Sequence, residues 1–298
     1  MSVISILGIF VADISFSGNK IPVTGETILG DSYNIGPGGK GCNQAITVSR
    51  LGGKVNFISK IGNDEYGKLA ITKLKKNNID TSNIIISEKH QTGVAGILVD
   101  RNTGKNAINV IVGAPSSLKI EEINFEIIKK SKIFLTQLEV PTEVTLSCLK
   151  TAKDNGVLTI LNPAPALELS KEFFNLIDYF TPNETEAEFY TGIKIINEGD
   201  AKIASEKLLK LGVKKIIITL GEKGLFFSDG KEEFFLKANT VKAIDTTGAG
   251  DAFNGGFAFA LLKGKKIRES LEFANKVAGI STTKLGAGDA MPFLKDLG

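Results

Sequence analysis

The chain has 298 residues, of which 42% are hydrophobic and 23% are charged, an ordinary composition for a globular fold with a large core. Its 36 basic and 33 acidic residues leave a formal net charge of +3, which is too balanced to favour a nucleic acid or a membrane as partner. The single histidine, His90, excludes a histidine-rich zinc site and makes a Ser-His-Asp triad depend on one residue of a polar loop.

The first segment, MSVISILGIFVAD, predicts a β-strand over 3–9. Asp13 interrupts the apolar run, and neither a basic leader nor a small-residue cleavage site accompanies it. No apolar run approaches the roughly 18 residues of a membrane helix. Cys42 and Cys148 form no CxxC pair, which is typical of a cytoplasmic protein with free thiols.

Two segments, approximately 14–35 and 93–112, have the pattern of strands and turns without a helix. The second contains a hairpin around Asn102 and Gly104. We expect both segments to form a small β-sheet that projects from the main domain as a lid. The edge of such a sheet could also pair with its own copy in a homodimer.

The segment GPGGKGCNQA, Gly36 to Ala45, predicts a glycine-rich turn into a helix over 43–51. Its GxGxxG match follows the lid strands instead of the first strand of a βαβ unit, which disfavours a dinucleotide-binding dehydrogenase. Cys42 stands where a Walker A loop has Ser or Thr. Lys40 and Asn43 at this turn could meet an anion and a hydroxyl.

Apolar runs alternate with helical patterns along the rest of the chain. The expected strands are 55–58, 132–138, 157–161, 177–181 and 214–220, and the expected helices include 142–155 and 200–211. Gly156 and Gly212 follow the two helices, where a left-handed residue is favoured. The alternation predicts one α/β domain over 1–298, with a mainly parallel β-sheet flanked by helices on both faces.

Polar residues follow three of these strands, where ligands bind in open parallel sheets. Glu139 follows the run IFLTQL, Asn183 and Glu186 follow the strand 177–181, and the segment 219–224 follows the strand 214–220. Each has a local explanation: Asn183 as a helix N-cap, Glu186 as its capping-box partner, and the glycines as turns. Together they predict a site at one edge of the sheet.

The segment DTTGAGDAFNGG, Asp245 to Gly256, places glycines at the start of an apolar core helix. Glycine costs a helix about 1 kcal/mol relative to alanine, so the backbone there is expected to approach a ligand closely. The first N–H groups of a helix attract anions. Asp251 could cap this helix, or it could take a proton from a nucleophile that attacks a phosphate held by those N–H groups.

In this order the motifs resemble the ribokinase family of carbohydrate kinases, also called the PfkB group. The similarity covers nearly the whole chain, through GIFVAD, PVTGET, GPGGKGCNQA, QLE, LNPAPA, TPNETEAE, ITLGEKG and DTTGAGDAFNGG. The resemblance implies an ATP-dependent transfer of phosphate to the 5-hydroxymethyl group of D-ribose, with Mg²⁺ accompanying the nucleotide.

The resemblance also implies roles for individual residues. Asp251 would be the catalytic base, and the backbone of Gly248, Ala249 and Gly250 would form the anion hole for the transferring phosphoryl group. The positions that match the sugar site are Val11, Asp13, Gly38, Gly39, Lys40, Asn43, Glu139 and Asp251. Those that match the nucleotide site are Asn183, Glu186, Thr219, Gly221, Gly224, Gly250 and Asn275, with Glu186 organising Mg²⁺ through water.

The chain departs from the family pattern at Val11, where the family has Asn two residues before the Asp that corresponds to Asp13. Valine cannot hydrogen-bond a ribose hydroxyl, and burying that hydroxyl without a partner would cost about 1–3 kcal/mol. Related kinases of 2-deoxyribose also look apolar at this position. Ribose is our first expectation, with Asp13, Asn43 or a water satisfying the hydroxyl while Val11 packs, and 2-deoxyribose is the alternative.

The second departure concerns the K⁺ that activates this family. Asp245, Thr247, Ser281, Lys284 and Gly286 match the cation site in position. The family's serine ligand, however, is replaced by Ala290, and Asp289 beside it is the candidate to compensate. The resemblance therefore implies K⁺ activation that is weakened.

Two further classes of function stay open as alternatives. One is another kinase of the same group, acting on a nucleoside or a hexose, which the GGKGxNQA and LNPAPA segments disfavour. The other is a nucleotide- or sugar-sensing binding protein on a kinase-like scaffold, which the intact Asp251 and GAG backbone disfavour.

Overall fold

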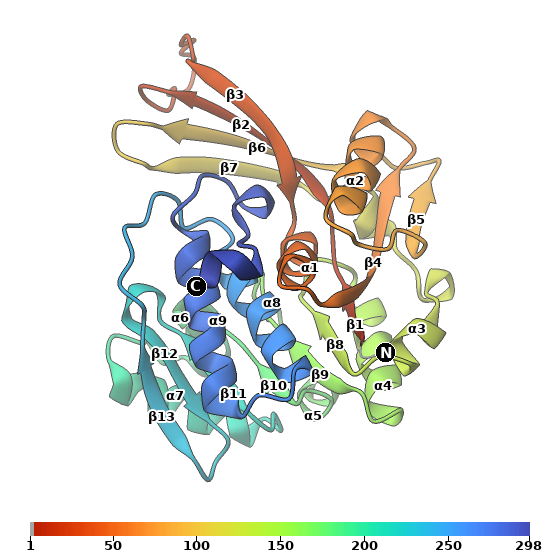
Figure 1. The fold of residues 1–298 in the computed structure, drawn as a ribbon, viewed down its shortest axis with the longest axis vertical. Helices are drawn as coiled ribbons and strands as arrows, with labels where there is room; N and C mark the ends of the chain where they lie inside the picture. Colours follow the sequence, from red (N-terminus) through yellow and green to blue (C-terminus); the bar gives the residue numbers. More distant parts are fainter. Residues whose placement is uncertain (1–2) are drawn as a thin grey trace.

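The computed structural model describes residues 3–298 (Figure 1). Its main sheet has nine strands in the order β13-β12-β11-β10-β9-β8-β1-β4-β5. Their bounds are β1 Val3–Leu7, β4 Lys54–Gly62, β5 Ile84–Ser87, β8 Ile133–Thr136, β9 Leu158–Leu161, β10 Tyr179–Phe180, β11 Ile216–Thr219, β12 Gly224–Ser228 and β13 Glu233–Lys237. All neighbours from β5 to β11 are parallel, and only the β11–β12 and β12–β13 pairs are antiparallel, so the mainly parallel sheet is confirmed.

The central strand β1 shows why the sheet requires helices on both faces. Ile4 and Ile6 pack into one buried cluster and Leu7 packs into another, because successive side chains of a strand point to opposite faces. Strand β8 is buried at every position. Buried parallel strands of this kind are stable only when both faces are covered.

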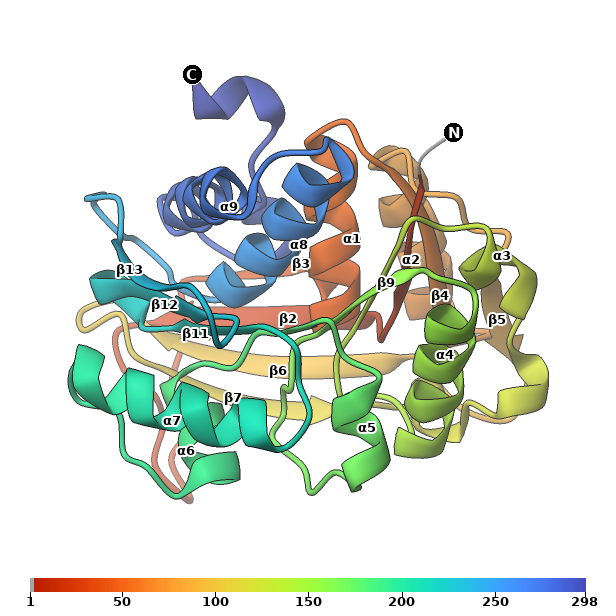
Figure 2. The same ribbon diagram turned by 90° about the horizontal axis from the view of Figure 1, so that it is seen from below.

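The helices divide between the two faces of the sheet, as Figure 2 shows. Helices α1 Lys40–Arg50, α2 Glu65–Lys76, α8 Ala249–Leu262 and α9 Ile267–Ser281 contribute to the core on one face. Helices α3 Phe125–Lys129, α4 Thr142–Asp154, α5 Lys171–Asn175, α6 Glu184–Thr191 and α7 Glu198–Lys210 contribute to the cores on the other.

Helix α1 begins earlier than the sequence indicates. It starts at Lys40, with Gly39 as the N-cap residue at φ 90°, instead of at residue 43. A positive φ suits glycine, so Gly39 reverses the chain and the helix follows at once. Lys40 and Asn43 therefore lie in the first turn of a helix and not in the preceding loop.

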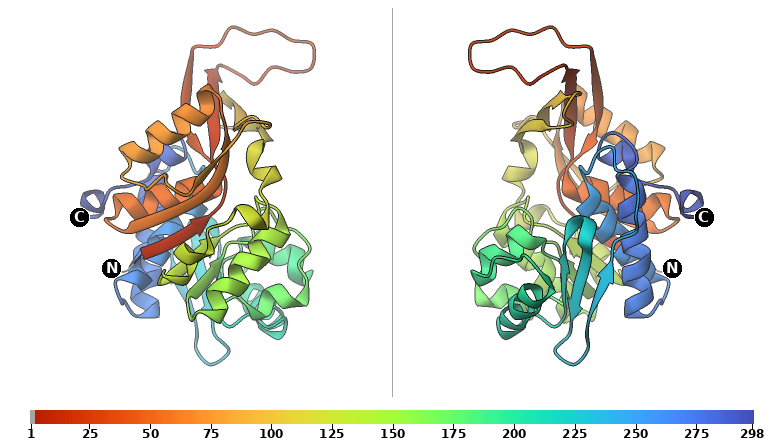
Figure 3. Two further views of the ribbon diagram at one scale, coloured as in Figure 1. Left: turned by 90° about the vertical axis from the view of Figure 1, so that its right-hand side faces the viewer. Right: turned by 90° about the vertical axis from the view of Figure 1, so that its left-hand side faces the viewer.

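The smaller sheet has four strands in the order β3-β2-β6-β7, with bounds β2 Val11–Gly18, β3 Ser32–Gly38, β6 Gly93–Asp100 and β7 Asn106–Ile111. It projects from one side of the main domain (Figure 3). The first predicted segment, 14–35, is too short by three residues at each end, because β2 starts at Val11 and β3 continues to Gly38. Both extensions lead directly into the candidate site.

No helix within residues 3–298 is long and apolar enough to cross a membrane.

Candidate active site

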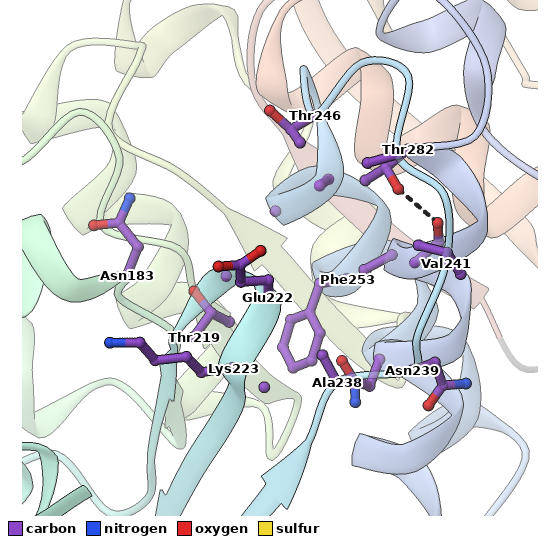
Figure 4. Close-up of a pocket in the computed structure, with 18 of the residues that line it drawn as sticks. Asn183, Thr219, Glu222, Lys223, Ala238, Asn239, Val241, Thr246, Phe253 and Thr282 are labelled. Atoms are coloured by element: carbon purple, nitrogen blue, oxygen red, sulfur yellow. Dashed lines mark hydrogen bonds between the residues drawn. The ribbon is translucent and has the colours of Figure 1, made fainter. Parts of the chain in front are cut away.

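Two cavities meet at the start of α8. The larger has a volume of about 720 Å³ and the smaller about 180 Å³, and both are lined by Asn183, Thr219, Thr246, Ala249 and Gly250. In Figure 4, Asn183 and Thr219 lie on one side of the larger cavity, Val241 and Thr282 lie on the other, and Phe253 lies between them. The smaller cavity also contacts Lys40, Glu186 and Asp251.

The first turn of α8 presents backbone N–H groups to both cavities. Gly248 is the N-cap residue in the left-handed conformation at φ 77°, and no side chain caps the helix. The capping role considered for Asp251 is therefore wrong. The Ala249 N–H donates to Thr246 O at 3.2 Å, and the next N–H groups of the uncapped helix start have no intrahelical acceptor, which suits them to an anion.

The Asp251 carboxylate instead turns toward α1. Its Oδ2 accepts a hydrogen bond from Asn43 Nδ2 at 2.9 Å, and its Oδ1 accepts one from Gln44 Nε2 at 3.2 Å. Burial raises the pKa of Asp251, while the positive charge of Lys40 and the two amide donors act in the opposite direction. A carboxyl with a raised pKa beside an anion-binding helix start is a candidate general base.

Lys40 is the positive centre of a group of acids. Burial lowers the pKa of Lys40, but Asp251, Glu139 and Glu186 outweigh this effect and raise it. The Lys40 backbone N–H also donates to Glu139 Oε2 at 2.9 Å, which joins the start of α1 to the end of β8. Burial raises the pKa of Glu139 to about 7, against the lowering effect of Lys40.

Asp13 reaches this group from β2. Burial, followed by the charges of Asp251 and Asp289, raises the pKa of Asp13 to about 7. Its carboxylate lies against β3 where Gly38 has no side chain, because a Cβ there would be 2.1 Å from Asp13 Oδ1. Gly38 therefore supports the site by leaving space, while Gly39 turns the chain into α1.

Asn43 has a free acceptor beside the same carboxylates. Its Nδ2 donates to Asp251, and its Oδ1 is buried without a donor among residues 3–298. A buried polar atom without a partner costs stability unless a ligand satisfies it. The atom fits the prediction that Asn43 binds a hydroxyl.

Val11 is buried between glycines of the two neighbouring strands. It pairs with Gly38 on β3 and with Gly93 on β6, and it is 3% exposed. Because it precedes Asp13 by two residues on a strand, both side chains point to the same face. Val11 also belongs to a buried apolar cluster with Ile58 and Ala95.

The predicted nucleotide residues surround the two cavities. Asn183 and Glu186 form a reciprocal capping box at the start of α6, with Asn183 N donating to Glu186 Oε2 at 2.9 Å, so the local explanation for both is confirmed. Burial raises the pKa of Glu186 to about 7, and the charge of Lys40 lowers it. Thr219, Gly221 and Gly224 line the larger cavity, as does Asn275, whose Nδ2 donates to Lys237 O at 2.7 Å.

Three of the five predicted cation residues come together. Asp245 Oδ1 accepts from the Thr247 N–H at 2.9 Å and from its hydroxyl at 2.6 Å, and Asp245 Oδ2 accepts from the Gly286 N–H at 2.9 Å. The side chain of Ser281 donates to Ala278 O, and that of Lys284 pairs with Asp296.

Ala290 and Asp289, the two residues at the position of the family's serine ligand for K⁺, do not supply a side-chain oxygen as that serine would. Ala290 is buried, and Asp289 pairs with Lys73 at 3.4 Å. A Cβ on Gly36 would lie 3.0 Å from Asp289 Oδ2, so this carboxylate lies against the end of β3. It also contributes to the raised pKa of Asp13.

Sequence reasoning missed several residues around Asp251. Gln44 and Gln137 form a buried row of amides behind it, and Asn254 Nδ2 donates to Gly250 O at 2.9 Å. Gln44 and Asn254 belong to motifs that were recognised, but a motif does not show which of its residues contact one another. Phe253 and Val241 of the larger cavity were missed because apolar residues carry no chemical signal in a sequence.

Comparison with known proteins bears on the chemistry of this site. The pfkB family carbohydrate kinase model matches residues 1–294. A ribokinase of Haemophilus influenzae is 42% identical over 291 residues, which cover 97% of this chain and 95% of the relative. A deoxyribokinase of Salmonella typhi is 34% identical over 295 residues, which cover 98% and 96%. The structure of Arabidopsis thaliana ribokinase complexed with ribose and ATP matches with a TM-score of 0.92 at 30% identity, covering 99% of this chain and 97% of that one.

Proposed function

The chain belongs to the pfkB family of carbohydrate kinases, and we propose that it transfers the γ-phosphoryl group of ATP to the 5-hydroxymethyl group of D-ribose. The observation that carries this proposal is the buried Asp251 carboxylate, which lies at the uncapped start of α8 where the two cavities meet. The 42% identity to a ribokinase and the fold shared with a ribokinase bound to ribose and ATP support the choice of substrates.

In this proposal the larger cavity takes the nucleotide and the smaller one takes the reacting groups. The adenine base of the nucleotide contacts the apolar and amide side chains around Val241, Phe253 and Asn275. The phosphates approach Thr219 and the glycines that follow it, and the γ-phosphoryl group lies at the backbone of Gly248, Ala249 and Gly250, the predicted anion hole.

The sugar lies between β2, α1 and the end of β8. Asp13 and Glu139 accept hydrogen bonds from its hydroxyls, and the free Oδ1 of Asn43 accepts another. Asp251 takes the proton from the 5-hydroxyl as its oxygen attacks phosphorus, and Lys40 compensates the charge that collects there. Gly38 leaves space for the Asp13 carboxylate, and Gly39 turns the chain into α1.

Mg²⁺ would enter with the nucleotide, since residues 3–298 contain no cluster of three acidic, histidine or cysteine ligands. Glu186 fits an indirect role, because both its oxygens already accept hydrogen bonds from Asn183 and would reach the ion through water. Bound there, Mg²⁺ would neutralise charge on the phosphates.

The free, buried thiols of Cys42 and Cys148 support a cytoplasmic location for the enzyme.

A coupled assay of ATP consumption with ribose, Mg²⁺ and K⁺ tests the proposed function. We expect turnover by the natural chain and a loss of several orders of magnitude in Asp251→Asn, which keeps the shape of the side chain but cannot accept the proton. Nucleotide binding should persist in that variant. Near-normal turnover in Asp251→Asn would remove this residue from the role of base, and absence of turnover with any pentose would reject the function.

Val11 favours a second candidate, a kinase of 2-deoxy-D-ribose. An apolar side chain on the face that carries Asp13 offers no partner to one ribose hydroxyl, and a deoxyribokinase is among the relatives. A kinase of another sugar or of a nucleoside is a weaker candidate, because the motifs around Lys40 and Asn183 match ribokinases.

We predict that Val11→Asn raises the ratio of kcat/KM for ribose to that for 2-deoxyribose by about tenfold, because a satisfied hydrogen bond of about 1.4 kcal/mol corresponds to that factor. The measurement compares both sugars in one assay. Val11→Ala is the matched control, since it opens space without adding a polar group and should leave the ratio unchanged. An unchanged ratio in Val11→Asn would show that position 11 does not contact the sugar.

We propose that K⁺ activates the enzyme weakly, through a site formed by carbonyl oxygens around Asp245, Thr247, Ser281, Lys284 and Gly286. The rate should be higher in K⁺ than in tetramethylammonium, and Ala290→Ser should lower the K⁺ concentration for half-maximal activation by supplying the missing oxygen. Potassium titrations of both proteins measure this. Equal rates in the two cations would argue against the site.

We also propose a homodimer formed through the small sheet, which would act as a lid. Its edge strand β7 is exposed along its length, and Ile108 and Val110, each about half exposed, lie on the face of the sheet that carries Asp13. Sedimentation velocity should show a dimer for the natural chain and a monomer for the double variant Ile108→Asp, Val110→Asp. A natural chain that sediments only as a monomer at working concentration would refute the dimer.

A further inference from the structure

A row of two buried amides stands behind the proposed base. Gln44 on α1 is 0% exposed, and Gln137, directly after β8, is 1% exposed. Gln44 Nε2 donates to Asp251 Oδ1 at 3.2 Å, with a longer contact of 3.4 Å to Asn162 Oδ1. Gln137 Nε2 donates to Gln44 Oε1. Neither glutamine lines the two cavities, and both are less exposed than Asn43, which is 4% exposed and which we place at the sugar, so we assign the glutamines to Asp251 and not to a ligand.

The row has a direction. An amide has one donor end and one acceptor end, whereas an ionised carboxylate only accepts. Because Gln137 occupies Oε1 of Gln44 with a donor, the Nε2 group of Gln44 faces Asp251, as the ionised carboxylate requires. The opposite orientation would place Oε1 against Asp251 and would demand a proton on the carboxyl.

This direction leaves an unpaired atom at the far end of the row. Gln137 Oε1 is buried and has no donor among residues 3–298. The backbone closes around it, since a Cβ on Gly8 would lie 2.4 Å from this oxygen and one on Gly41 would lie 3.1 Å from it. Stability alone gives no reason to bury an unpaired amide oxygen, whereas orienting Gln44 toward the base does.

We propose that Gln44, oriented by Gln137, is a positioning residue that keeps Asp251 ionised and its carboxylate fixed, so that the base is ready to accept the proton of the sugar. This inference rests on the proposed role of Asp251 and extends it to residues that do not touch the substrate. The remaining lone pairs of the carboxylate stay available to the hydroxyl.

Several titratable groups face Asp251, and the glutamines differ from all of them in having no group that titrates. The group comprises Lys40 and Cys42 of α1, Asp13 of β2, Glu139 after β8 and Glu186 of α6. The charge of Asp251 acts to raise the pKa of each of these groups. Replacing Gln44 or Gln137 with a neutral side chain changes the hydrogen bonding of Asp251 without adding or removing a charge. A change in the pKa of Asp251 can then be assigned to the lost hydrogen bond.

The first experiment compares pH profiles of kcat/KM for the sugar in Gln44→Met and Gln137→Met. Methionine keeps the approximate volume and removes the donor. In Gln44→Met the acid limb, the fall of kcat/KM at low pH as the base becomes protonated, should move to higher pH by about one unit. At pH values on this limb kcat/KM should fall about tenfold, and it should recover at high pH. Gln137→Met should shift the limb in the same direction by less, because Gln44 stays present but loses its orientation.

Thr47→Val is the matched control. Thr47 lies on the same helix, is equally buried, and donates to Asn43 O at 2.8 Å without reaching Asp251. Its loss should leave the acid limb in place whatever it does to stability. A loss of activity in Gln44→Met that is uniform across pH, with no movement of the limb, would reduce Gln44 to a packing role and overturn the proposal.

A second measurement is independent of turnover. Titration of protein labelled with ¹³C at the aspartate carboxyls, with the Asp251 signal identified by its absence in Asp251→Asn, reports the protonation of that carboxyl directly. A higher pKa in Gln44→Met or Gln137→Met supports the inference even if the natural chain phosphorylates none of the sugars tested, in which case only the proposed function fails. An unchanged pKa in both variants overturns the inference even if the enzyme is an active ribokinase.

Discussion

The burial of one carboxylate, that of Asp251, is the constraint on which the site depends. A buried carboxylate is expensive to ionise unless charges and donors replace the water that it loses. Lys40 supplies the opposite charge, Asn43 and Gln44 supply donors, and the start of α8 adds a favourable dipole. Three of these four elements come from the first turns of α1, so the start of α1 and the start of α8 form the surroundings of the carboxylate together.

The site as a whole carries more acid than base, and this suits its proposed ligands. Asp13, Glu139 and Glu186 all have pKa values raised to about 7, with Lys40 as the shared cation. A neutral sugar offers many hydroxyl donors to such carboxylates. A triphosphate would be repelled there unless it arrived with Mg²⁺ and met the backbone N–H groups of α8 and the turns after β11.

The two departures from the family pattern lie outside the group of charged residues around Lys40 and Asp251. Val11, the first residue of β2, packs in an apolar cluster, and Ala290 lies in the short 3-10 helix Gly288–Ala290 that follows α9. Neither contacts the Asp251 carboxylate through a hydrogen bond. In the proposed function, chemistry and specificity would therefore be carried by different residues: those that surround Asp251 would serve phosphoryl transfer, and Val11 and Ala290 would affect the choice of sugar and the response to a cation.

The sequence by itself was enough for the alternating α/β pattern, the small sheet, and the clusters around Lys40, Asn183 and Asp251, because periodicity and glycine-rich turns are local properties of the chain. It also led to the expectation that Asp251 acts as a base, through a resemblance carried by motifs. Only the tertiary structure decided that Asp251 does not cap its helix, that α1 begins at Lys40, and that Asp289 pairs with Lys73. It alone revealed the amide row from Gln137 to Asp251, because those contacts join residues 93 and 207 positions apart in the chain, and the direction of a buried hydrogen bond depends on partners that no local pattern encodes.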